Sequence, residues 1–364
     1  MEVYLTVLTV FFIFSFVEVF TANKLAKKFV LGLSWLIAVL VIGLRWETGT
    51  DWYPYLGFFQ DSLRWQDVME MWSIEKGYGI LNWLVRNITD NYSVFLFVHA
   101  MLFYGLLLIG FSKITKYPQT AFMFYFGSNL GIVGSNRQLL ALAIIVFSLP
   151  FIFNKRVKSY ILAVILAFSF HSTAFLNAAY IFLNRYISNK WIWLTLMIAL
   201  AIGISPLPLQ IFGLFGGLGD FYLNKTDAYI SSADEVVGLT IGGIIKRLLF
   251  FTFFYLFRVR VAKVTTHYNL LFNGYWFSIV LYLLFANALP VMISRGALYF
   301  NIMESLLFVV ILGILRNPVH KALYIMGLLI IAITLMYQSI QAYPDLFDPY
   351  KSLWYNENFH RVMY

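Results

Sequence analysis

The sequence contains no cysteine and few charged residues, and these two absences exclude several classes of protein. Without cysteine the chain has no disulfide, no thiolate nucleophile and no cysteine-ligated metal site. Asp, Glu, Lys and Arg make up 12% of the residues, whereas a soluble domain carries about 25%. The histidines show no HExxH spacing, and no P-loop, GxGxxG or GxSxG motif is present. We therefore expect neither zinc-dependent nor nucleotide-dependent chemistry. No metal or cofactor is predicted, although the carboxylates outside the apolar runs do not exclude a divalent metal.

Apolar sequence dominates the chain. Hydrophobic residues make up 61% of it and the mean hydropathy is +0.78, which indicates an integral membrane protein with spanning helices of about 20 residues each. The first apolar run lacks the basic segment and the cleavage site of a signal peptide, so we interpret it as a spanning helix. We predict an all-α polytopic protein with about 12 (10–12) transmembrane helices in a single transmembrane domain, residues 1–364. The apolar runs cover residues 3–20, 29–44, 92–112, 119–133, 138–153, 159–183, 191–204, 207–219, 241–257, 268–289, 297–315 and 321–340.

The distribution of Lys and Arg predicts the topology. With the amino terminus outside, the basic clusters share one side, which we predict to be cytoplasmic. The opposite side holds an extracytoplasmic segment at 45–91 with an amphipathic helix near 79–88, a second loop at 220–240, and an ordered carboxy-terminal tail from 342. The run 207–219 is short and glycine-rich. If it entered and left the membrane on the same side, the later basic clusters would face outward, so we interpret it as a spanning segment. The net charge of +9 therefore reflects topology rather than nucleic-acid binding. The cytoplasmic set is Lys24, Lys27, Lys28, Lys113, Lys116, Lys155, Arg156, Lys158, Arg258, Arg260, Lys263, Arg316 and Lys321.

The stretch at 43–53, Gly-Leu-Arg-Trp-Glu-Thr-Gly-Thr-Asp-Trp-Tyr, follows the second apolar run and concentrates polar chemistry at the membrane surface. Arg45 and Asp51 are candidate partners, because an arginine at the edge of a bilayer is costly unless it is paired or reaches water. Trp52 and Tyr53 are aromatics typical of a membrane interface. Two interpretations remain open: an interfacial loop that anchors a helix, or a site for anion binding and proton transfer.

Three further polar features lie within or beside apolar runs. Arg137 precedes a helix whose N–H groups favour an anion, although it is also compatible with a cap and a snorkelling arginine. His171 lies in the middle of the run 159–183, where it either packs or lines a polar cavity. Arg295 lies at another outer helix end, and Glu304 follows on the same helix, either as a buried partner or as a residue of a cavity. Arg45, Arg137 and Arg295 together predict one extracytoplasmic site for a phosphorylated substrate.

Several of these segments resemble the EpsG-like proteins, which belong with the Wzy-type polysaccharide polymerases. The 43–52 stretch resembles their G-x-R-x-x-x-G-x-D-[YW] motif, and Glu75-x-Gly77-Tyr78 resembles their acidic-Gly-aromatic element. Trp46-Glu47 and Trp52 depart from the common residues of the first motif, which bears on substrate identity. Three further segments are similar to motifs of that family in the same order: Asn136-Arg137-Gln138, Ala167 to Ala174 around His171, and Arg295 with Tyr299-Phe300.

The resemblance implies a GT-C-like glycosyltransferase in the bacterial cytoplasmic membrane with an outward-facing site. Its substrates would be undecaprenyl-pyrophosphate-linked oligosaccharides, polymerised into O-antigen, capsule or exopolysaccharide, with membrane lipid and a chain-length regulator protein as candidate partners. On this view Arg45, Arg137 and Arg295 stabilise the departing pyrophosphate. Asp51 is the first candidate for the base that accepts the acceptor's proton and His171 the second. The remaining substrate-binding candidates are Glu75, Trp52, Tyr53, Gln138 and Tyr299.

Three other functions fit parts of the pattern. A lipid-linked glycan flippase or transporter needs charged residues along a path open to both sides, whereas here nearly all carboxylates fall on one predicted face. A membrane-bound O-acyltransferase needs a histidine reached from the cytoplasm, and His171 has no polar company on that side. A transferase resembling the O-antigen ligases shares the chemistry of a polymerase, and the sequence does not separate the two.

Overall fold

The computed structural model describes residues 1–71, 73–214, 241–288, 292–341 and 343–353, and these residues are mostly helical. The described ranges contain no strand, only an isolated antiparallel bridge between Arg45 and Ser352. The chain forms two compact units, one of residues 1–175 and 308–364 and one of residues 176–307. The predicted all-α, polytopic membrane class is confirmed. The loop predicted at 220–240 lies outside the described residues.

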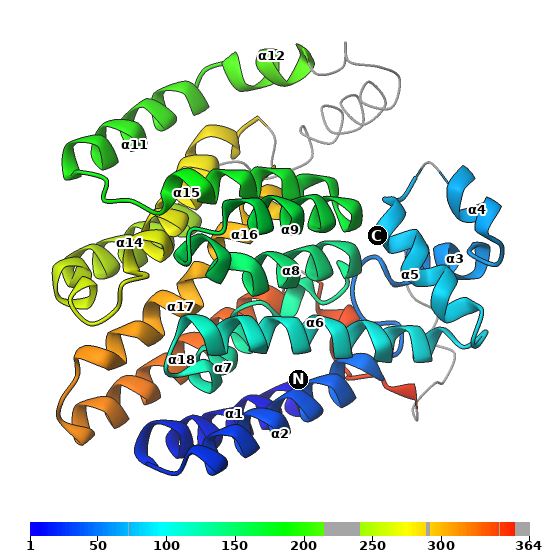
Figure 1. Ribbon diagram of the computed structural model, residues 1–364, viewed down its shortest axis with the longest axis horizontal. Coiled ribbons are helices and arrows are strands. Elements are labelled where there is room, and N and C mark those ends of the chain that lie inside the picture. Colours follow the sequence, from blue (N-terminus) through cyan, green and yellow to red (C-terminus); the bar gives the residue numbers. More distant parts are fainter. Residues whose placement is uncertain (72, 215–240, 289–291, 342, 354–364) are drawn as a thin grey trace. The chain divides into compact units, whose positions relative to one another are not determined.

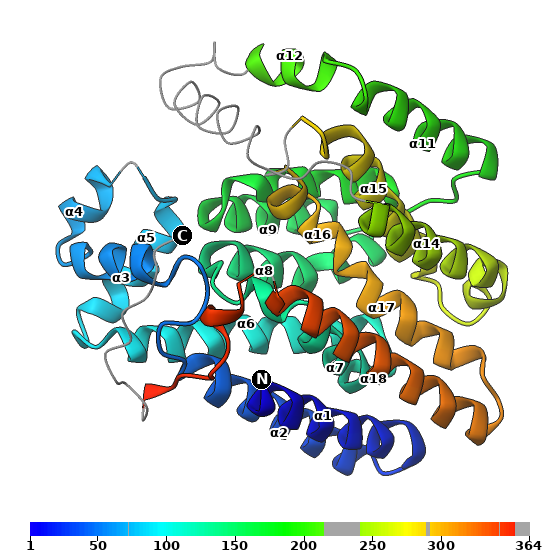
Figure 2. The same cartoon turned by 180° about the vertical axis from the view of Figure 1, so that it is seen from behind.

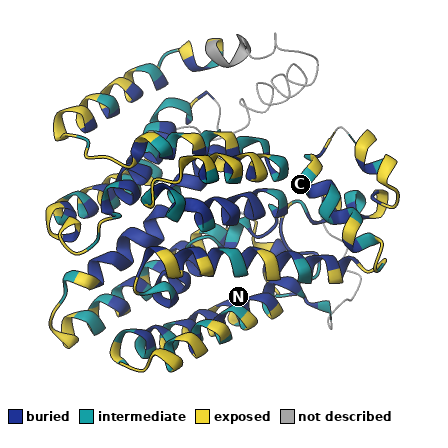
Figure 3. Cartoon of the chain, in the orientation of Figure 1, coloured by how far each residue is buried: buried dark blue, intermediate teal, exposed yellow. Residues whose placement is uncertain are grey.

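The first unit contains most of the long helices (Figures 1 and 2). The central helix α6 packs against α2 and α8, α8 packs against α9, and α7 packs against α1 and α18. Most residues of α8 are buried, whereas α1 and α2 expose many apolar residues, as a lipid-facing helix does (Figure 3). The elements are α1 (Glu2–Phe20), α2 (Lys24–Gly43), α3 (Trp52–Asp61), α4 (Trp65–Glu70), α5 (Lys76–Arg86), α6 (Tyr92–Ile114), α7 (Pro118–Ser128), η1 (Leu130–Ile132), α8 (Asn136–Phe153), α9 (Val157–Phe170), η6 (Ile311–Ile314), α18 (Pro318–Gln341) and η7 (Pro344–Leu346).

A carboxylate from one apolar helix caps another. Glu18 of α1 is buried, and its oxygens accept hydrogen bonds from the N–H groups of Gln119 (2.7 Å) and Thr120 (2.9 Å) and from the Thr120 hydroxyl (2.8 Å). These N–H groups lie in the first turn of α7, where helix geometry leaves them without an intrahelical acceptor. The positive end of the helix dipole also favours a carboxylate there. Glu18 therefore joins α1 to α7 within the apolar interior.

The second unit is built around α15, which runs beside α11. The Trp276 indole donates to the Ile192 carbonyl, and Gly203 lies against Leu283, so the two helices run in the same direction. The elements are α10 (Tyr180–Leu183), α11 (Asn189–Gly203), α12 (Leu207–Leu214), α14 (Ile241–Ala262), α15 (Tyr268–Phe285), η5 (Met292–Gly296) and α16 (Leu298–Asn301), while η2 (Ser172–Ala179) and α17 (Met303–Val310) continue from one unit into the other.

Not every predicted span is one uninterrupted helix. Among the described helices, α1, α2, α6, α8, α15 and α18 are long and apolar enough to cross a membrane by length and composition. The predicted run at 207–219 is described only as far as Leu214, the last residue of helix α12, and its remainder lies outside the described residues.

The predicted single span at 159–183 is wrong. Helix α9 ends at Phe170, His171 is extended with φ −154° and ψ 124°, and a 3₁₀ helix follows from Ser172. The consecutive polar residues His171, Ser172 and Thr173 favour such a break, because short polar side chains bond locally in competition with the helix. The Ser172 N–H, freed from the α-helix, donates to the carboxylate of Glu75. His171 therefore lies at the end of a helix and not in its middle.

Within the second unit, the connection between α10 and α11 lies beside α15 and the end of α14. The Asn273 amide donates to the carbonyls of Leu183 and Arg185, near the start of α15. The Arg258 guanidinium donates to the Ile187 carbonyl and the Asn189 amide oxygen. Residues 183–189 thus lie beside the end of α14 that carries Arg258.

Candidate functional site

Two loops of the first unit cross at a pair of glycines. Gly49 has a φ of +94°, a conformation that suits glycine, and it packs against Gly134. A Cβ atom added to Gly134 would lie 2.8 Å from the Gly49 α-carbon, a distance that real side chains do not adopt. This crossing brings the 43–51 stretch next to Asn136 and Arg137 at the start of α8.

The carboxy-terminal segment also holds this stretch. The Trp46 N–H donates to the Lys351 carbonyl and the Leu353 N–H donates to the Leu44 carbonyl, each at 2.9 Å. The hydroxyl of Tyr350 donates to the carbonyl of Val41 at 2.8 Å. The tail is therefore ordered over residues 343–353 as predicted, and residues 354–364 lie outside the described part.

The position of Glu75, immediately before α5, is held by its neighbours in sequence. Lys76 Nζ donates to the carbonyls of Val68 (3.0 Å) and Met69 (2.7 Å) near the end of α4, where a cation is favoured. Gly77 lies against Ser169 of α9, and a Cβ atom there would come within 2.7 Å of the Ser169 carbonyl oxygen. The missing side chain at 77 thus lets α5 and α9 approach closely. The amphipathic helix predicted at 79–88 is present as α5.

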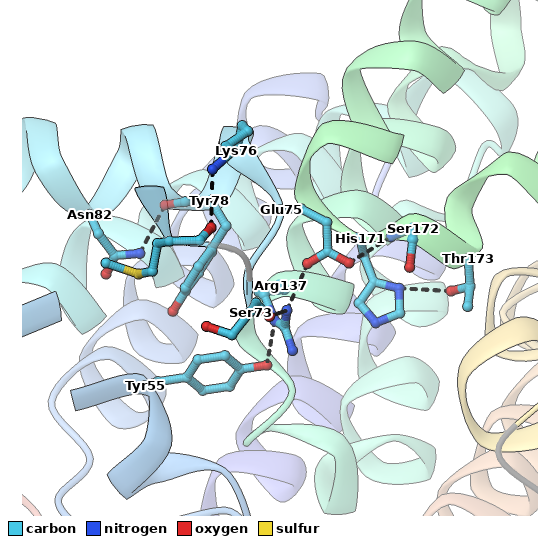
Figure 4. A network of polar contacts seen from close by, with 11 residues as sticks. Tyr55, Ser73, Glu75, Lys76, Tyr78, Asn82, Arg137, His171, Ser172 and Thr173 are labelled. Atoms are coloured by element: carbon cyan, nitrogen blue, oxygen red, sulfur yellow. Dashed lines mark hydrogen bonds and ion pairs between the residues drawn. The ribbon is translucent and has the colours of Figure 1, made fainter. Parts of the chain in front are cut away.

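Glu75 joins the start of α8 to the end of α9 (Figure 4). Its Oε2 lies 2.7 Å from Nη1 of Arg137, and its Oε1 accepts a 3.0 Å hydrogen bond from the Ser172 N–H. The side chains of Arg137 and Glu75 are 18% and 14% exposed, so water screens their attraction only partly. A partly buried, hydrogen-bonded pair of this kind is stronger than an exposed surface ion pair.

Arg137 is anchored on one side and accessible on another. Its Nε donates to the Tyr55 hydroxyl at 3.4 Å, and its Nη1 also reaches the Ser73 carbonyl at 3.5 Å. Nη2 makes no hydrogen bond with the described residues, and it is not among their buried polar atoms that lack a partner. The geometry therefore holds the guanidinium in place and leaves one nitrogen available to a ligand.

Burial and charge have opposite effects on the pKa of Glu75. Burial raises it, while the Arg137 guanidinium, His171 and the Ser172 N–H lower it by more, so the net pKa lies below the ordinary value. Burial also raises the pKa of Tyr55, although the Arg137 guanidinium partly offsets this increase. Burial raises the pKa of Tyr78 well above its ordinary value. At neutral pH the cluster thus contains a carboxylate, a guanidinium and neutral phenols.

The two predicted bases differ in their surroundings. His171 is buried, with Nδ1 2.7 Å from the Thr173 hydroxyl oxygen. Asp51 is half-buried at the start of α3, and its carboxylate makes no hydrogen bond or ion pair with the described residues. Its charge acts on Tyr55, the residue that contacts Arg137. Asp51 therefore has an unengaged carboxylate beside the Arg137 cluster.

Arg45 lies inside the protein. Its side chain is 2% exposed, with Nη1 2.7 Å from the Ile42 carbonyl and Nη2 2.7 Å from the Asn136 amide oxygen. Nη2 also lies 3.4 Å from the Val133 carbonyl. Arg45 and Arg137 are thus linked through Asn136, but only Arg137 is accessible.

The other predicted site residues of the first unit are mainly packed. Trp52 is 3% exposed and its ring contacts those of Trp46 and Tyr92. Tyr53 is exposed and its hydroxyl donates to Glu47 at 2.6 Å. Gln138 is buried in the first turn of α8.

Arg295 and Tyr299 belong to the second unit. Arg295 is half-buried in η5, and Tyr299 is fully buried, its carbonyl accepting a 2.9 Å hydrogen bond from the Tyr180 hydroxyl. Glu304, the predicted partner of Arg295, forms an ion pair with Lys246 at 3.6 Å. The convergence of Arg295 with the other arginines stays a prediction.

Sequence reasoning missed Tyr55 and Ser172, which shape this site, and Lys246, which pairs with Glu304 in the second unit. Tyr55 lies four residues after Asp51, the helical spacing that signals a shared face. Ser172 contributes its backbone N–H. Every residue except proline carries this group, so the residue type does not indicate the role. Lys246 lies inside an apolar run, and an ionisable residue at such a place is itself a signal.

Among the described residues, no three His, Asp or Glu side chains gather in a way that could hold a metal ion. The family model that matches this chain is that of the EpsG family, over residues 28–352, a range that includes every site residue above. No curated protein and no solved structure matches the chain.

Proposed function

The chain belongs to the EpsG family, and from this premise we propose that it polymerises lipid-linked oligosaccharide repeat units at the outer face of the bacterial cytoplasmic membrane. Family membership supports a polysaccharide-polymerase type of role. The observation that carries the finer proposal is the Glu75–Arg137 pair, which joins segments 43–51, 75–78, 134–138 and 167–173 around one accessible guanidinium nitrogen.

The proposed reaction transfers a glycan from undecaprenyl pyrophosphate to a sugar hydroxyl. The hydroxyl oxygen of the acceptor bonds to the anomeric carbon of the donor glycan. The bond from that carbon to the pyrophosphate oxygen breaks, and its electron pair leaves with the lipid pyrophosphate. Negative charge develops on the leaving oxygen, and a guanidinium held in position before the reaction stabilises it. We assign this role to Arg137, whose Nη2 is accessible while Nε and Nη1 are anchored.

The acceptor hydroxyl loses one proton in the same step, and a positioned base assists its removal. We assign this role to Asp51, because its carboxylate is half-buried and unengaged among the described residues. Glu75 is a poorer base, since its lowered pKa weakens its hold on a proton. Its role in the proposal is to orient Arg137. His171, beside Glu75 and bonded to Thr173, supports that orientation.

The distribution of charge supports an outward orientation of the site. Lys and Arg lie in the first two turns of α2, at and after the end of α6, and between α8 and α9, and the three connections beside them contain no Asp or Glu. The 45–91 segment at the opposite ends of α2 and α6 is instead rich in Asp and Glu. Lys and Arg favour the cytoplasmic side, which supports an extracytoplasmic location for the Glu75–Arg137 pair.

Deletion of the gene, followed by electrophoresis of the surface glycan, tests this function. We expect the deletion strain to carry at most one repeat unit on each anchor, and the wild-type gene on a plasmid to restore the full ladder. Loss of even the single unit would point to a flippase instead. Full-length polymer that accumulates on its lipid carrier without reaching the final anchor would point to a ligase-like transferase.

A further inference from the structure

Arg45 was expected to touch the substrate, but its surroundings suit a different task. The guanidinium is 2% exposed and no carboxylate contacts it within the described residues. A buried charge without compensation is costly. Here the compensation comes from the Ile42 and Val133 carbonyls and the Asn136 amide oxygen. Ile42 lies in the last turn of α2, where carbonyls lack helical partners and the helix dipole favours a cation.

These contacts join two stretches that are far apart in the sequence, the end of α2 and the residues that lead into α8. Arg45 follows α2, Val133 lies in the loop before α8, and Asn136 is the first residue of α8. The Asn136 carbonyl is also 2.8 Å from Nε2 of His99 on α6. Both the side chain and the backbone of Asn136 are therefore held.

Because Asn136 is held in place, the direction of the Arg137 side chain is determined as well. Successive side chains of an α-helix lie about 100° apart around its axis. With the Asn136 side chain directed at Arg45, the Arg137 side chain is turned toward Tyr55 and Glu75, as observed. We infer that Arg45 is a positioning residue, which sets the register of the first turn of α8 through Asn136 and thereby aims Arg137 at the proposed pyrophosphate position. The inference rests on the proposed function only for the identity of that ligand.

Thiol labelling tests the location of Arg45 without any assay of activity. The chain has no cysteine, so Arg45→Cys, Arg137→Cys and Arg64→Cys each introduce a single thiol, and Arg64 is an exposed control. A membrane-impermeant maleimide is applied to intact cells. We expect it to modify positions 64 and 137, and to modify position 45 only after denaturation. If Arg45→Cys does not accumulate, Asn136→Cys, at a position 1% exposed, replaces it with the same expectation. Modification of the native protein at position 45, or at its replacement, overturns the inference.

A double-mutant cycle tests the link to Asn136. Arg45→Lys keeps the charge but loses the fork that reaches two acceptors at once, and Asn136→Ala removes one acceptor. We expect each variant to lower the rate of polymer formation about tenfold, as the loss of a charge-assisted hydrogen bond does, with little change in KM. The double variant should be no slower than the slower single variant. Multiplicative losses, or a raised KM with unchanged kcat, would contradict a positioning role. Arg258→Lys, in the other unit, serves as a control for a buried arginine and should leave the rate unchanged.

These outcomes separate the inference from the proposed function. If position 45 is buried and Arg45→Lys and Arg137→Lys both leave polymer length normal, the proposed function of this site fails. If Arg137→Lys abolishes polymer while position 45 is modified in the native protein, only the role of Arg45 fails.

Discussion

Arg45 and Arg137 show how the surroundings of a residue decide what it can do. Both carry the same charge and lie close to Asn136, yet one is enclosed by carbonyls and the other keeps an accessible nitrogen. The carboxylate of Glu75 accounts for much of this difference, because it anchors Arg137 from one side. The ionisation of Glu75 is therefore the property on which the geometry of the cluster depends.

The lowered pKa of Glu75 predicts how stability responds to acid. Burial raises this pKa, and Arg137, His171 and the Ser172 N–H lower it by more. A carboxylate whose folded-state pKa is lowered stabilises the protein above its ordinary pKa of about 4.3 and loses this contribution as the pH falls through the folded value. Glu75→Gln should therefore lower the Tm by a few degrees at every pH from 8 to about 5. The difference from wild type should shrink only in more acidic buffer.

Unfolding followed by tryptophan fluorescence measures this effect. Glu70→Gln, at an exposed position in α4, is the matched control and should melt like the wild type. A difference for Glu75→Gln that already vanishes between pH 7 and pH 5 would mean that the pKa is raised.

At the scale of elements, close backbone approaches bring the motifs together. Gly49 against Gly134 joins the stretch after α2 to the start of α8, and Gly77 against Ser169 joins α5 to α9. These contacts explain why glycine accompanies the charged residues of both motifs. The charged side chains meet only because the backbones beneath them can touch.

Alanine substitutions test this explanation. Gly49→Ala would place a Cβ atom against Gly134 in a backbone conformation with φ of +94°, and we expect a loss of about 3 kcal/mol or more in the free energy of unfolding. Gly57→Ala, inside α3 with no atom within 4 Å of the added Cβ, should instead gain about 0.5–1 kcal/mol from helix propensity. Denaturant unfolding of the two variants compares them. Equal stability of both would show that the glycine crossing does not constrain the fold.

The break in the run 159–183 could not be predicted from apolarity, because hydrophobic residues continue on both sides of His171. What ends α9 is the tertiary contact of Ser172 and Ser169 with the segment around Glu75. The helices with uninterrupted apolar sequence, such as α1, α6 and α18, were by contrast predicted close to their observed bounds.

At the scale of the whole molecule, the contacts of the second unit bear on the predicted topology. Residues 183–189 lie beside Arg258 within that unit. Because Lys and Arg favour the cytoplasmic side, we expect this part of the chain, with Arg185 and Lys190, to share the side of Arg258.

Single cysteines test this topology. Ser188→Cys should react with an impermeant thiol reagent under the same conditions as Lys158→Cys, which is only after the membrane is permeabilised. Arg64→Cys should react in intact cells. All three positions are exposed. Reaction of Ser188→Cys in intact cells would show that residues 159–183 form a single span.

The sequence was sufficient to predict the class, the long helices and several residues of the cluster around Arg137. Glu75, Arg137 and His171 were each nominated from motifs, but their pairing was not, since contacts between distant segments leave no trace in one sequence. The burial of Arg45 was equally invisible, because an arginine after a helix looks the same whether it faces water or its own helix carbonyls. The second unit's Arg295 was nominated in the same way, and its part in the site remains a prediction.

Reconstitution of the purified protein in liposomes tests the central claim that Arg137 assists glycan transfer between lipid-linked substrates. The liposomes contain undecaprenyl-pyrophosphate-linked repeat units and no nucleotide sugar, and products are separated by size. We predict that wild type and Arg64→Lys form polymer at equal rates, while Arg137→Lys, with its fork lost, is slower on the order of 100-fold. Polymer formed at the wild-type rate by Arg137→Lys would contradict the account.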